Sequence, residues 1–566
     1  MKYSVLAAVY EKLENTPAKL EKSDIIAKLL KETNIDLLPK VVLLLNGRVF
    51  PSWSESELGV ANQLMIRAIE KSCGISQKEI NSVFNKTGDL GLTVKELSGK
   101  KKQATLGKKT LTVEKVFENM QLLPKQEGKN SQERKLNLIA ELLSQASPLE
   151  SVYVVRTILG QLRIGVAEGI VRDSIAKAFE VESEDVENAW FLNPDYGEIA
   201  TIAKTKGKKG LNKVKIKIGR PIKVQLAEKA PSLEEALEAF EEPVLEYKYD
   251  GARMLIHKKG DSVRIFTRRL ENITKAFPDI VELCKENILA KDCILDSEGL
   301  AIDENNRPLP FQMISQRIKR KYDIQKTAKQ IPMQLNVFDV IYLDGKSFFD
   351  TTLKDRRKIL SKIVKEVPGK IQLSKQLATK DIKKAGKFYK DSLSNGQEGL
   401  IVKNLQATYQ PGRRVSGGWL KVKPTLESLD LVITGAVWGT GKRAGWLGSY
   451  ILACRDPETG DFLECGMLGS GLKEKKTNED DVTLEELTEL IKPNIENEKG
   501  NTVKISPQFV IEVAYEEIQK SPTYSSGYAL RFPRLLRVRP DKGPDEADDL
   551  NRLDKIFYVQ KGKRQS

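Results

Sequence analysis

Histidine and paired cysteines are nearly missing from this chain of 566 residues. Its single histidine, His257, lies in the alternating stretch from Met254, which is typical of an ordinary strand residue. The five cysteines are scattered without any Cys-x-x-Cys pair. These scarcities exclude catalytic triads and multi-histidine metal sites, and they argue against a zinc module or a disulfide framework. We therefore expect reduced, packed cysteines and no chemical role for His257.

Long hydrophobic runs are also missing. No stretch approaches the roughly eighteen uninterrupted apolar residues of a membrane span, and the short apolar segment near the amino terminus has no small-residue cleavage site after it. A hydrophobic fraction of 40% with 30% charged residues is typical of a globular protein. These features predict a cytoplasmic protein without a signal peptide and without a membrane partner.

Positive charge is in excess, with 93 lysines and arginines against 78 acidic residues and a net charge of +15. This balance suits a polyanionic partner, although many basic proteins bind none. The segment from Lys204 to Pro221 has eight basic residues, no acid and three glycines, and Val214, Ile216 and Ile218 alternate there with lysines. We predict a basic loop that leads into an edge strand, either as a solvated linker or in contact with phosphates.

The length favours three domains, and the residue pattern changes twice along the chain. Up to about residue 200 the apolar residues follow helical spacing; strands with interspersed helices follow, and after Pro424 strands with glycine-rich turns continue with one helical stretch, DVTLEELTELIKP. The expected fold is a multidomain α+β protein with an all-α domain (residues 1–218), a mixed α/β domain (residues 219–424) and a small β-barrel (residues 425–566).

The motif that carries chemistry begins at Lys248. The tetrapeptide KYDG (residues 248–251) is weak evidence alone, since it recurs by chance. Six further blocks follow in order: TRRLENIT (267–274), DSEG (296–299), VFDVIYLDG (337–345), EGLIVK (398–403), WLKVK (419–423) and RVRPDK (537–542). With these blocks the sequence resembles the ATP-dependent DNA ligase family, within the lysine nucleotidyltransferases that also include RNA ligases and mRNA capping enzymes. The resemblance covers essentially the whole chain and implies an adenylation domain followed by an OB-fold domain.

The resemblance implies that Lys248 attacks the α-phosphorus of ATP and passes AMP to the 5′-phosphate of a nick. A lysine nucleophile must be deprotonated, and nearby cations lower its pKa because they disfavour the ammonium form. Taken singly, each of these cations would be an ordinary surface charge. As a set they are expected to surround the triphosphate: Arg253, Arg268, Lys421 and Lys423.

Three carboxylates are expected to serve Mg²⁺, a hard cation that prefers oxygen ligands. Glu398 and Glu298 are the predicted ligands, and by the resemblance Glu298 has the alternative role of holding the ribose hydroxyls. Asp250 is expected to orient Lys248 and to reach the metal through water. Its alternative reading is a turn aspartate before Gly251.

The resemblance also assigns the base and phosphate contacts. Phe338 matches the aromatic residue that stacks on adenine, although by residue type alone it would be a core residue. Glu246 matches the carboxylate that accepts a hydrogen bond from the adenine N6 amine. The remaining expected contacts are basic: one of Arg413 and Arg414, and the pair Arg539 and Lys542, whose R-x-D-K form is used against the β- and γ-phosphates.

The substrate is predicted from the amino-terminal domain. The segment RTILGQLRIGVAEGIVRDSIAKAF (156–179) resembles the helical DNA-binding domain of archaeal and eukaryotic replicative ligases. By residues alone, Arg156 and Arg163 with Gly160 and Gly165 either pack internally or present backbone amides to phosphates. The implied protein is a monomeric, nucleoid-associated ligase of nicked double-stranded DNA, acting in replication, repair and recombination.

Alternative functions use the same motifs. An RNA ligase or capping-type nucleotidyltransferase shares the lysine block, and a nucleic-acid-binding protein with an inactive nucleotide site would keep only the basic surface. An NAD-dependent ligase is disfavoured because its tetracysteine zinc module is missing. A sliding clamp is the weaker partner prediction, since the stretch KKQATLGKK carries Gln103 and Leu106 without an aromatic residue.

Overall fold

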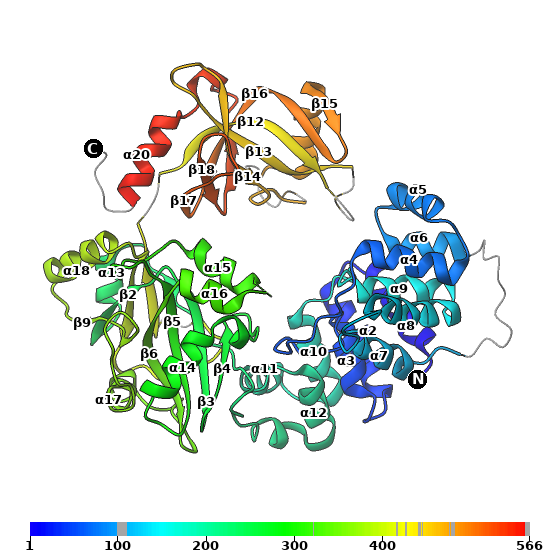
Figure 1. Cartoon of the computed structure of the whole chain (residues 1–566), viewed down its shortest axis with the longest axis horizontal. Helices are drawn as coiled ribbons and strands as arrows, with labels where there is room; N and C mark the ends of the chain where they lie inside the picture. The colour runs from blue at the N-terminus through cyan, green and yellow to red at the C-terminus, as the bar shows by residue number, and fades with distance from the viewer. Residues whose placement is uncertain are drawn as a thin grey trace. The chain divides into compact units, whose positions relative to one another are not determined.

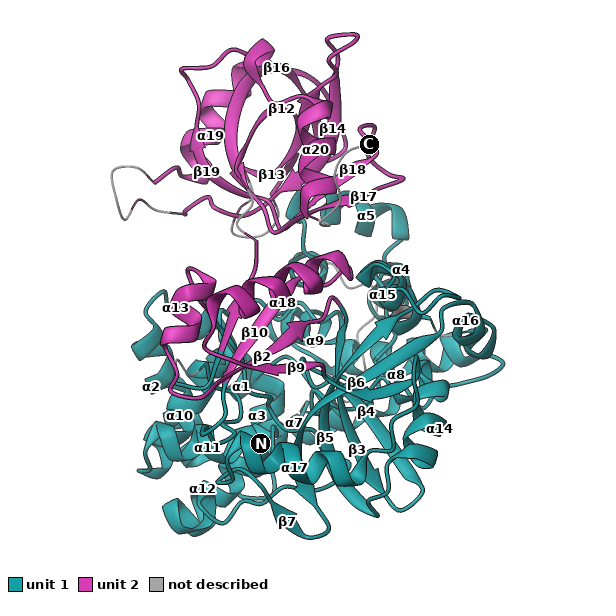
Figure 2. Ribbon diagram, turned by 90° about the vertical axis from the view of Figure 1, so that its left-hand side faces the viewer, with its two compact units in different colours: residues 1–228, 251–374, 404–419 teal, residues 229–250, 375–403, 420–566 magenta. Residues whose placement is uncertain are grey.

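The computed structural model of the chain describes residues 1–98, 110–320, 322–414, 417–424, 427–439, 443, 445–474, 476 and 481–560. Gln103 and Leu106 of the expected clamp-binding stretch lie outside the described residues. The chain divides into two compact units (Figure 2): residues 1–228, 251–374 and 404–419 form the first, and residues 229–250, 375–403 and 420–566 form the second. The range predicted as the mixed domain therefore contributes to both units, and the predicted domain boundaries stay a prediction.

The amino-terminal part of the first unit is helical (Figure 1). In its first helix, Tyr3, Leu6, Ala7 and Tyr10 are buried, which is the spacing of one apolar helix face. The helices are α1 (Tyr3–Asn15), α2 (Lys19–Glu32), α3 (Leu38–Leu45), α4 (Asn62–Cys73), α5 (Gln77–Thr87), α6 (Leu90–Ser98), α7 (Val113–Leu122), α8 (Ser131–Gln145), α9 (Pro148–Ile158), α10 (Glu168–Phe179), α11 (Ser183–Leu192) and α12 (Tyr196–Leu211). They share one apolar core, as expected of a separate all-α domain.

The prediction for Lys204 to Pro221 was wrong. Helix α12 extends to Leu211 across a kink at Gly207, whose φ is 53°, and residues 212–220 form turns without a strand. Burial of Ile199, Ala203 and Leu211 on one side keeps the chain helical, so most lysines of this segment lie on the solvent side. Val214 packs against the helical core instead of pairing with a sheet.

The rest of the first unit is built on an antiparallel sheet with the order β4-β3-β5-β6-β7, to which β8 adds in parallel beside β6. The strands are β3 (Ala252–Lys259), β4 (Ser262–Thr267), β5 (Asp292–Ala301), β6 (Met333–Leu343), β7 (Lys346–Ser347) and β8 (Ile371–Leu373). The sheet shares an apolar core with residues of the neighbouring helices α14 (Pro278–Asn287), α15 (Phe311–Lys319) and α17 (Leu353–Ile363), and α16 (Ile324–Gln330) contacts α14 and α15. His257 is a buried residue of β3, as predicted for a strand position, and all five cysteines are free and buried, which confirms the prediction of packed thiols.

The second unit contains a smaller sheet with the order β1-β11-β10-β2-β9. Its elements are β1 (Glu228–Lys229), α13 (Leu233–Glu238), β2 (Pro243–Lys248), β9 (Gln376–Ala378), α18 (Ile382–Ser394), β10 (Gly399–Asn404) and β11 (Trp419–Val422). One face is apolar: Leu245, Tyr247, Leu400, Val402, Leu420 and Val422 form a cluster with residues of α13 and α18. Because side chains alternate along a strand, the opposite face carries Glu246, Lys248, Lys403 and Lys421.

The carboxy-terminal part of the second unit is rich in strands, as predicted. A sheet with the order β14-β13-β12-β16-β15, joined by β19 beside β16, is accompanied by the hairpin β17–β18. The elements are β12 (Leu429–Trp438), β13 (Leu447–Arg455), β14 (Phe462–Leu468), α19 (Leu484–Ile491), β15 (Ile495–Lys499), β16 (Thr502–Ala514), β17 (Glu517–Lys520), β18 (Tyr528–Arg531), β19 (Arg534–Val538) and α20 (Leu550–Gln560).

Helix α20 was missed by the sequence prediction, which expected one helical stretch in this region. Leu553 and Phe557, four residues apart, bury one side of α20 in the core of the strands. The available signal was the helical spacing of these residues with Leu550 and Ile556, which pack against the same core. None of the helices in the described ranges combines the length and the apolar composition needed to cross a bilayer.

Candidate nucleotide-binding site

Lys248 stands at the end of β2 and donates a hydrogen bond from Nζ to Oε2 of Glu398. The backbone N–H of Glu398 in turn donates to the Lys248 carbonyl at 2.9 Å. Nζ of Lys423 lies 2.6 Å from the same Glu398 oxygen. Burial alone would raise the pKa of Glu398, but the two ammonium groups lower it to about 2. Two lysines therefore share one ionised carboxylate.

Asp250 is the second carboxylate of this cluster. Its backbone N–H donates to Oε1 of Gln397 at 3.1 Å. Burial, followed by the negative charges of Glu398 and Glu517, raises the pKa of Asp250 to about 7. Asp250 and Glu398 thus repel each other, and a hard cation with oxygen ligands would relieve that repulsion.

Arg531 belongs to this cluster and was missed by the sequence reasoning. It lies 3.7 Å from Asp250 and 3.9 Å from Glu398, and 3.1 Å from Glu517, its partner across the β17–β18 hairpin. The available signal was its place in RFPRLLRVRPDK, from which only the R-x-D-K residues were selected. Arg531 supplies a cation to the carboxylates in the described structure.

Glu246 lies two residues before Lys248, on the same face of the strand. Nζ of Lys403 donates to its Oε2 at 2.7 Å, and Nε2 of Gln376 donates to its Oε1 at 2.6 Å. The side chains of Lys403 and Glu246 are 2% and 3% exposed. Sequence reasoning identified Glu246 but neither of its partners.

Arg253, a predicted phosphate contact, lies in the first unit. Its Nε donates to Oδ1 of Asp296 at 2.8 Å, and its Nη1 donates to the carbonyl of Gln225 at 2.8 Å. The guanidinium also lies 5.4 Å from the ring of Phe338 and 5.5 Å from the ring of Trp419. Burial opposes the charge of Arg253, but Asp296 more than offsets this and raises its pKa. Arg253 is therefore fixed in position, and Phe338 is buried against it.

Asp296 and Tyr409 hold Arg253 in position, and neither residue was predicted from the sequence. The hydroxyl of Tyr409 donates to Oδ2 of Asp296 at 2.8 Å and accepts from the backbone N–H of Gln225 at 3.1 Å. Burial and the charge of Asp296 raise the pKa of Tyr409 well above its ordinary value. The hydroxyl therefore stays protonated and links two chain segments to the partner of Arg253.

Glu298 pairs with Arg253 across β3 and β5 and lies beside Gly251. A Cβ on Gly251 would come within 2.5 Å of the Gly299 carbonyl and 2.9 Å of Cγ of Glu298, which explains the glycine of the lysine motif. Within the described residues, no three histidine, cysteine or acidic side chains are gathered as a metal cluster. The structure thus brings Asp250 and Glu398 together, and it places Glu298 on β5 of the other unit.

The arginines of the predicted set differ in their surroundings. Burial, then the charges of Arg253 and Arg414, lowers the pKa of Arg268. Arg413 instead donates to Glu184 at 2.9 Å and to Asn188 at 3.0 Å, both on α11. Of the two adjacent arginines, Arg414 therefore adds positive charge near Arg268 and Arg253.

Arg539 and Lys542 are held by a common carboxylate in the second unit. Asp430 lies 2.9 Å from Arg539 and 2.6 Å from Lys542, and Arg539 also contacts Asp541 at 2.7 Å. The hydrogen bond to Asp541, with the charge of Asp430, raises the pKa of Arg539. Lys421 is half-buried on β11, and its carbonyl accepts from the Ala230 N–H at 3.1 Å.

In the helical part, the structure distinguishes the two alternatives for Arg156, internal packing and a contact with phosphates. Arg156 packs internally, 3.0 Å from Asp89 and 2.8 Å from Glu14. Arg163 lies in the loop between α9 and α10 with a φ of 57° and remains one-third exposed, 3.4 Å from Asp89. Only Arg163 of this pair has access to an external phosphate.

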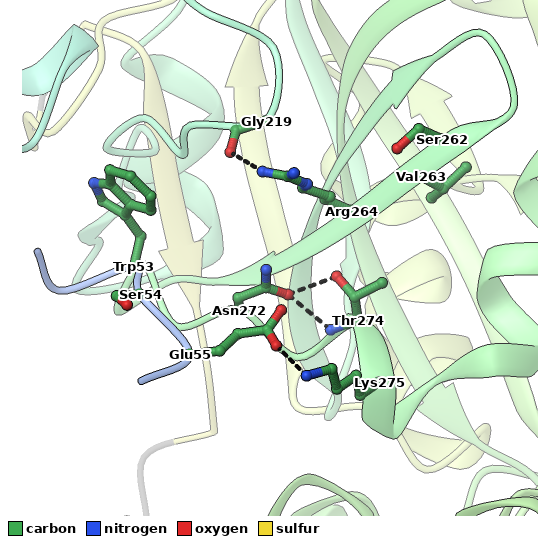
Figure 3. A pocket seen from close by; sticks show the side chains of 10 residues that line it. All are labelled: Trp53, Ser54, Glu55, Gly219, Ser262, Val263, Arg264, Asn272, Thr274 and Lys275. Carbon is green, nitrogen blue, oxygen red and sulfur yellow. Dashed lines mark hydrogen bonds and ion pairs between the residues drawn. The ribbon is translucent and has the colours of Figure 1, made fainter. Parts of the chain in front are cut away.

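A pocket of about 400 Å³ opens elsewhere in the first unit (Figure 3). Lys275 in its wall is paired with Glu55 at 2.6 Å, and Arg264 donates to the Gly219 carbonyl at 3.1 Å. Its lining residues are Trp53, Ser54, Glu55, Gly219, Ser262, Val263, Arg264, Asn272, Thr274 and Lys275. None of the predicted nucleotide contacts is among them, so this pocket is separate from the candidate site.

Comparison with known proteins covers the whole chain. Three family models match: DNA ligase N terminus over residues 2–176, ATP dependent DNA ligase domain over residues 224–423, and ATP dependent DNA ligase C terminal region over residues 443–542. The DNA ligase of Nanoarchaeum equitans is 47% identical over 564 residues, 99% of each chain. That of Thermococcus onnurineus is 45% identical over 561 residues, 99% of this chain and 98% of its own.

Solved structures agree in fold. The structure named Pmar-Lig_Pre. has a TM-score of 0.58 and 18% identity, over 94% of this chain and 99% of its own. At this identity the likeness shows the fold alone, and with the family matches it confirms the predicted multidomain α+β architecture with its helical, adenylation and OB domains. The chain belongs to the ATP-dependent DNA ligase family, with archaeal relatives of full length.

Proposed function

We propose that this ATP-dependent DNA ligase seals nicks in duplex DNA through Lys248, which accepts AMP from ATP. The observation that carries the proposal is the Lys248 ammonium, which donates to Glu398 while Lys423 contacts the same oxygen. Ionised Glu398 holds the Lys248 side chain in place at the end of β2, and Lys248 must lose its proton before it attacks. Lys423, the second cation at this carboxylate, would stabilise negative charge that develops on the phosphate.

The reaction follows from this nucleophile. The Lys248 nitrogen bonds to the α-phosphorus of ATP while the bond to the leaving pyrophosphate breaks. The 5′-phosphate of the nick then takes AMP from the lysine, and the 3′-hydroxyl displaces AMP to form the phosphodiester bond. Each step develops negative charge on a phosphate, so a ring of fixed cations supports all of them.

Asp250 and Glu398 are the proposed holders of Mg²⁺, with Glu298 as a third ligand or a ribose contact. Burial, together with the charges of Glu398 and Glu517, raises the pKa of Asp250. A divalent cation would offset the repulsion between these carboxylates, which supports the proposed ligands. When bound, the metal neutralises charge on the triphosphate. The remaining steps rest on the protein groups.

The nucleotide contacts are proposed residue by residue. Phe338 stacks on adenine and Glu246 accepts from its N6 amine. Of the adjacent arginines we favour Arg414, because Arg413 is engaged by α11. The remaining proposed phosphate and ribose contacts are Arg253, Arg268, Lys421, Lys423, Arg539 and Lys542.

The DNA substrate is proposed to bind through phosphate contacts and duplex shape, without base readout. The net charge of +15 and the exposed lysines that follow Ala203 support this mode. The enzyme is proposed to act as a monomer near the nucleoid in replication, repair and recombination, and a sliding clamp remains a proposed partner.

The test is covalent labelling with [α-³²P]ATP. Lys248→Ala is expected to abolish the enzyme–AMP adduct and to leave nicked-DNA binding largely intact, since the nucleophile supplies chemistry and other cations supply affinity. Lys259→Ala, an exposed lysine at the end of β3, is the matched control and should label normally. Wild-type labelling of Lys248→Ala would contradict the assignment. Labelling from GTP in place of ATP would favour a capping-type enzyme.

A further inference from the structure

Glu246 has two side-chain partners, the buried Lys403 and the half-buried Gln376. Lys403 lies on β10 and Gln376 on β9, so the strands on both sides of β2 each direct one donor at the same carboxylate. Lys403 and Glu246 are 2% and 3% exposed, and a charged pair removed from water in this way is costly unless its geometry is maintained. Strand packing alone would be served by apolar residues, so this pair calls for a functional explanation.

We propose that Lys403 and Gln376 set the nucleobase specificity of the enzyme by holding the two carboxylate oxygens of Glu246 in place as hydrogen-bond acceptors. This inference rests on the proposed role of Glu246 as the partner of the adenine 6-position. Lys403 is a positioning residue in this account, because it acts through Glu246 and not on the reacting atoms.

The hydrogen-bond inventory of a carboxylate supports the proposal. Each oxygen of an ionised carboxylate can accept about two hydrogen bonds. Oε2 receives one from Lys403 and Oε1 receives one from Gln376, which leaves acceptor capacity but no donor. The N6 amine of adenine can donate to that remaining capacity. A 6-oxo base such as hypoxanthine or guanine would instead place an acceptor against an acceptor, which is repulsive.

Loss of Lys403 should weaken this selection. Without the hydrogen bond from Lys403, Oε2 of Glu246 is no longer fixed, and a buried carboxylate without its cation is costly. Glu246 is then no longer held as an acceptor against the 6-position of the base. The discrimination between 6-amino and 6-oxo nucleotides would fall, while the lysine nucleophile and its contacts would remain in place.

The experiment compares self-nucleotidylation from [α-³²P]ATP and [α-³²P]ITP in the full chain. ITP differs from ATP at the 6-position of the base, where an oxo group replaces the amine and N1 carries hydrogen. We expect Lys403→Met to lower the ratio of kcat/KM for ATP over ITP by about tenfold or more, since discrimination by hydrogen bonding to a buried group is large. Lys403→Arg, which keeps the charge, is the matched control and should retain most of the ratio.

Gln376→Leu provides a second variant that keeps the Lys403–Glu246 pair, in case Lys403→Met fails to fold. It should lower the same ratio by a smaller factor, because the orientation of Glu246 is loosened while its charge is kept. Equal losses with ATP and ITP, in folded variants, would show a purely structural role and would overturn the proposal. Failure of the wild-type chain to form any enzyme–nucleotide adduct would instead contradict the proposed function itself, so the two failures are distinguishable.

Discussion

His257 illustrates at the scale of one residue how burial dominates the pKa of a side chain. Its Nδ1 accepts from the Gly219 N–H at 3.2 Å, and its Nε2 has no hydrogen-bond partner within the described part of the chain. Burial, with a contribution from the charge of Arg264, lowers its pKa from 6.5 to about 3. The neutral ring is therefore part of the folded state.

A pH dependence of stability follows, and its sign is set by the lowered pKa. Stability from neutral His257 is fully present above pH 6.5 and is lost as the pH falls towards 3, because the unfolded chain binds the proton more readily. Relative to His257→Gln, the wild type should lose about 2 kcal/mol of unfolding free energy by pH 5. Thermal unfolding of both proteins between pH 8 and pH 5 measures this. Parallel curves would contradict the assignment, as would an imidazole NMR signal that titrates near pH 6.5.

At the scale of elements, Gly399 brings β10 and β11 unusually close. Its φ is +133°, and a Cβ there would lie 2.2 Å from the Val422 carbonyl. Glu398 precedes this glycine and Lys423 follows Val422, so the close approach supports the contact between these two charged residues. The strand contact and the charge cluster therefore depend on the same glycine.

Gly399→Ala should lower both stability and activity. The added methyl group requires a strained backbone and a shift of the strands, which costs about 1–3 kcal/mol and lowers Tm by several degrees. Enzyme–AMP formation should fall as well, because Glu398 is displaced from Lys248. Gly386→Ala in α18 is the control: its Cβ would meet no atom within 4 Å, and alanine favours a helix, so stability should hold or rise. An unchanged Tm for Gly399→Ala would refute the explanation.

The sequence predicted those elements whose signal is local. The helical spacing up to about residue 200 and the strand patterns after it were such signals. The partners of Glu246 could not be predicted, because Lys403 meets Glu246 only through the pairing of strands that are far apart in the chain. Arg531 comes from an even more distant hairpin. The strand predicted after Lys204 was wrong for a similar reason, because the packing of helix α12 determines the conformation of this segment.

At the scale of the whole molecule, the order of the motif blocks carried more information than any single residue. Each lysine or arginine of the set is an ordinary surface charge by itself, yet the series from Lys248 to Lys542 identified the family that the full-length relatives show. What the order of blocks does not supply is the step of the reaction that each cation serves. That question separates the carboxy-terminal cations from those beside Lys248.

Arg539 and Lys542 are expected to matter in one chemical step. Pyrophosphate leaves only when Lys248 attacks ATP, whereas AMP is the leaving group when the nick is closed, so cations that face the β- and γ-phosphates should act in the first step alone. In the second unit Asp430 holds both side chains, at 2.9 Å from Arg539 and 2.6 Å from Lys542, which keeps them together. The alternative is a basic surface that binds DNA, and it predicts a small, uniform loss of affinity.

Separate assays of the two steps distinguish these roles. Arg539→Ala should slow self-adenylylation by roughly ten- to a thousandfold, in line with the loss of a charge contact in a transition state. Sealing of a nick that already carries 5′-AMP should fall much less. Arg537→Ala is the matched control, because Arg537 lies two residues away and pairs with Glu512 at 2.6 Å on an exposed part of β19. Equal losses in both steps for Arg539→Ala would remove the pyrophosphate role and assign the segment to DNA binding.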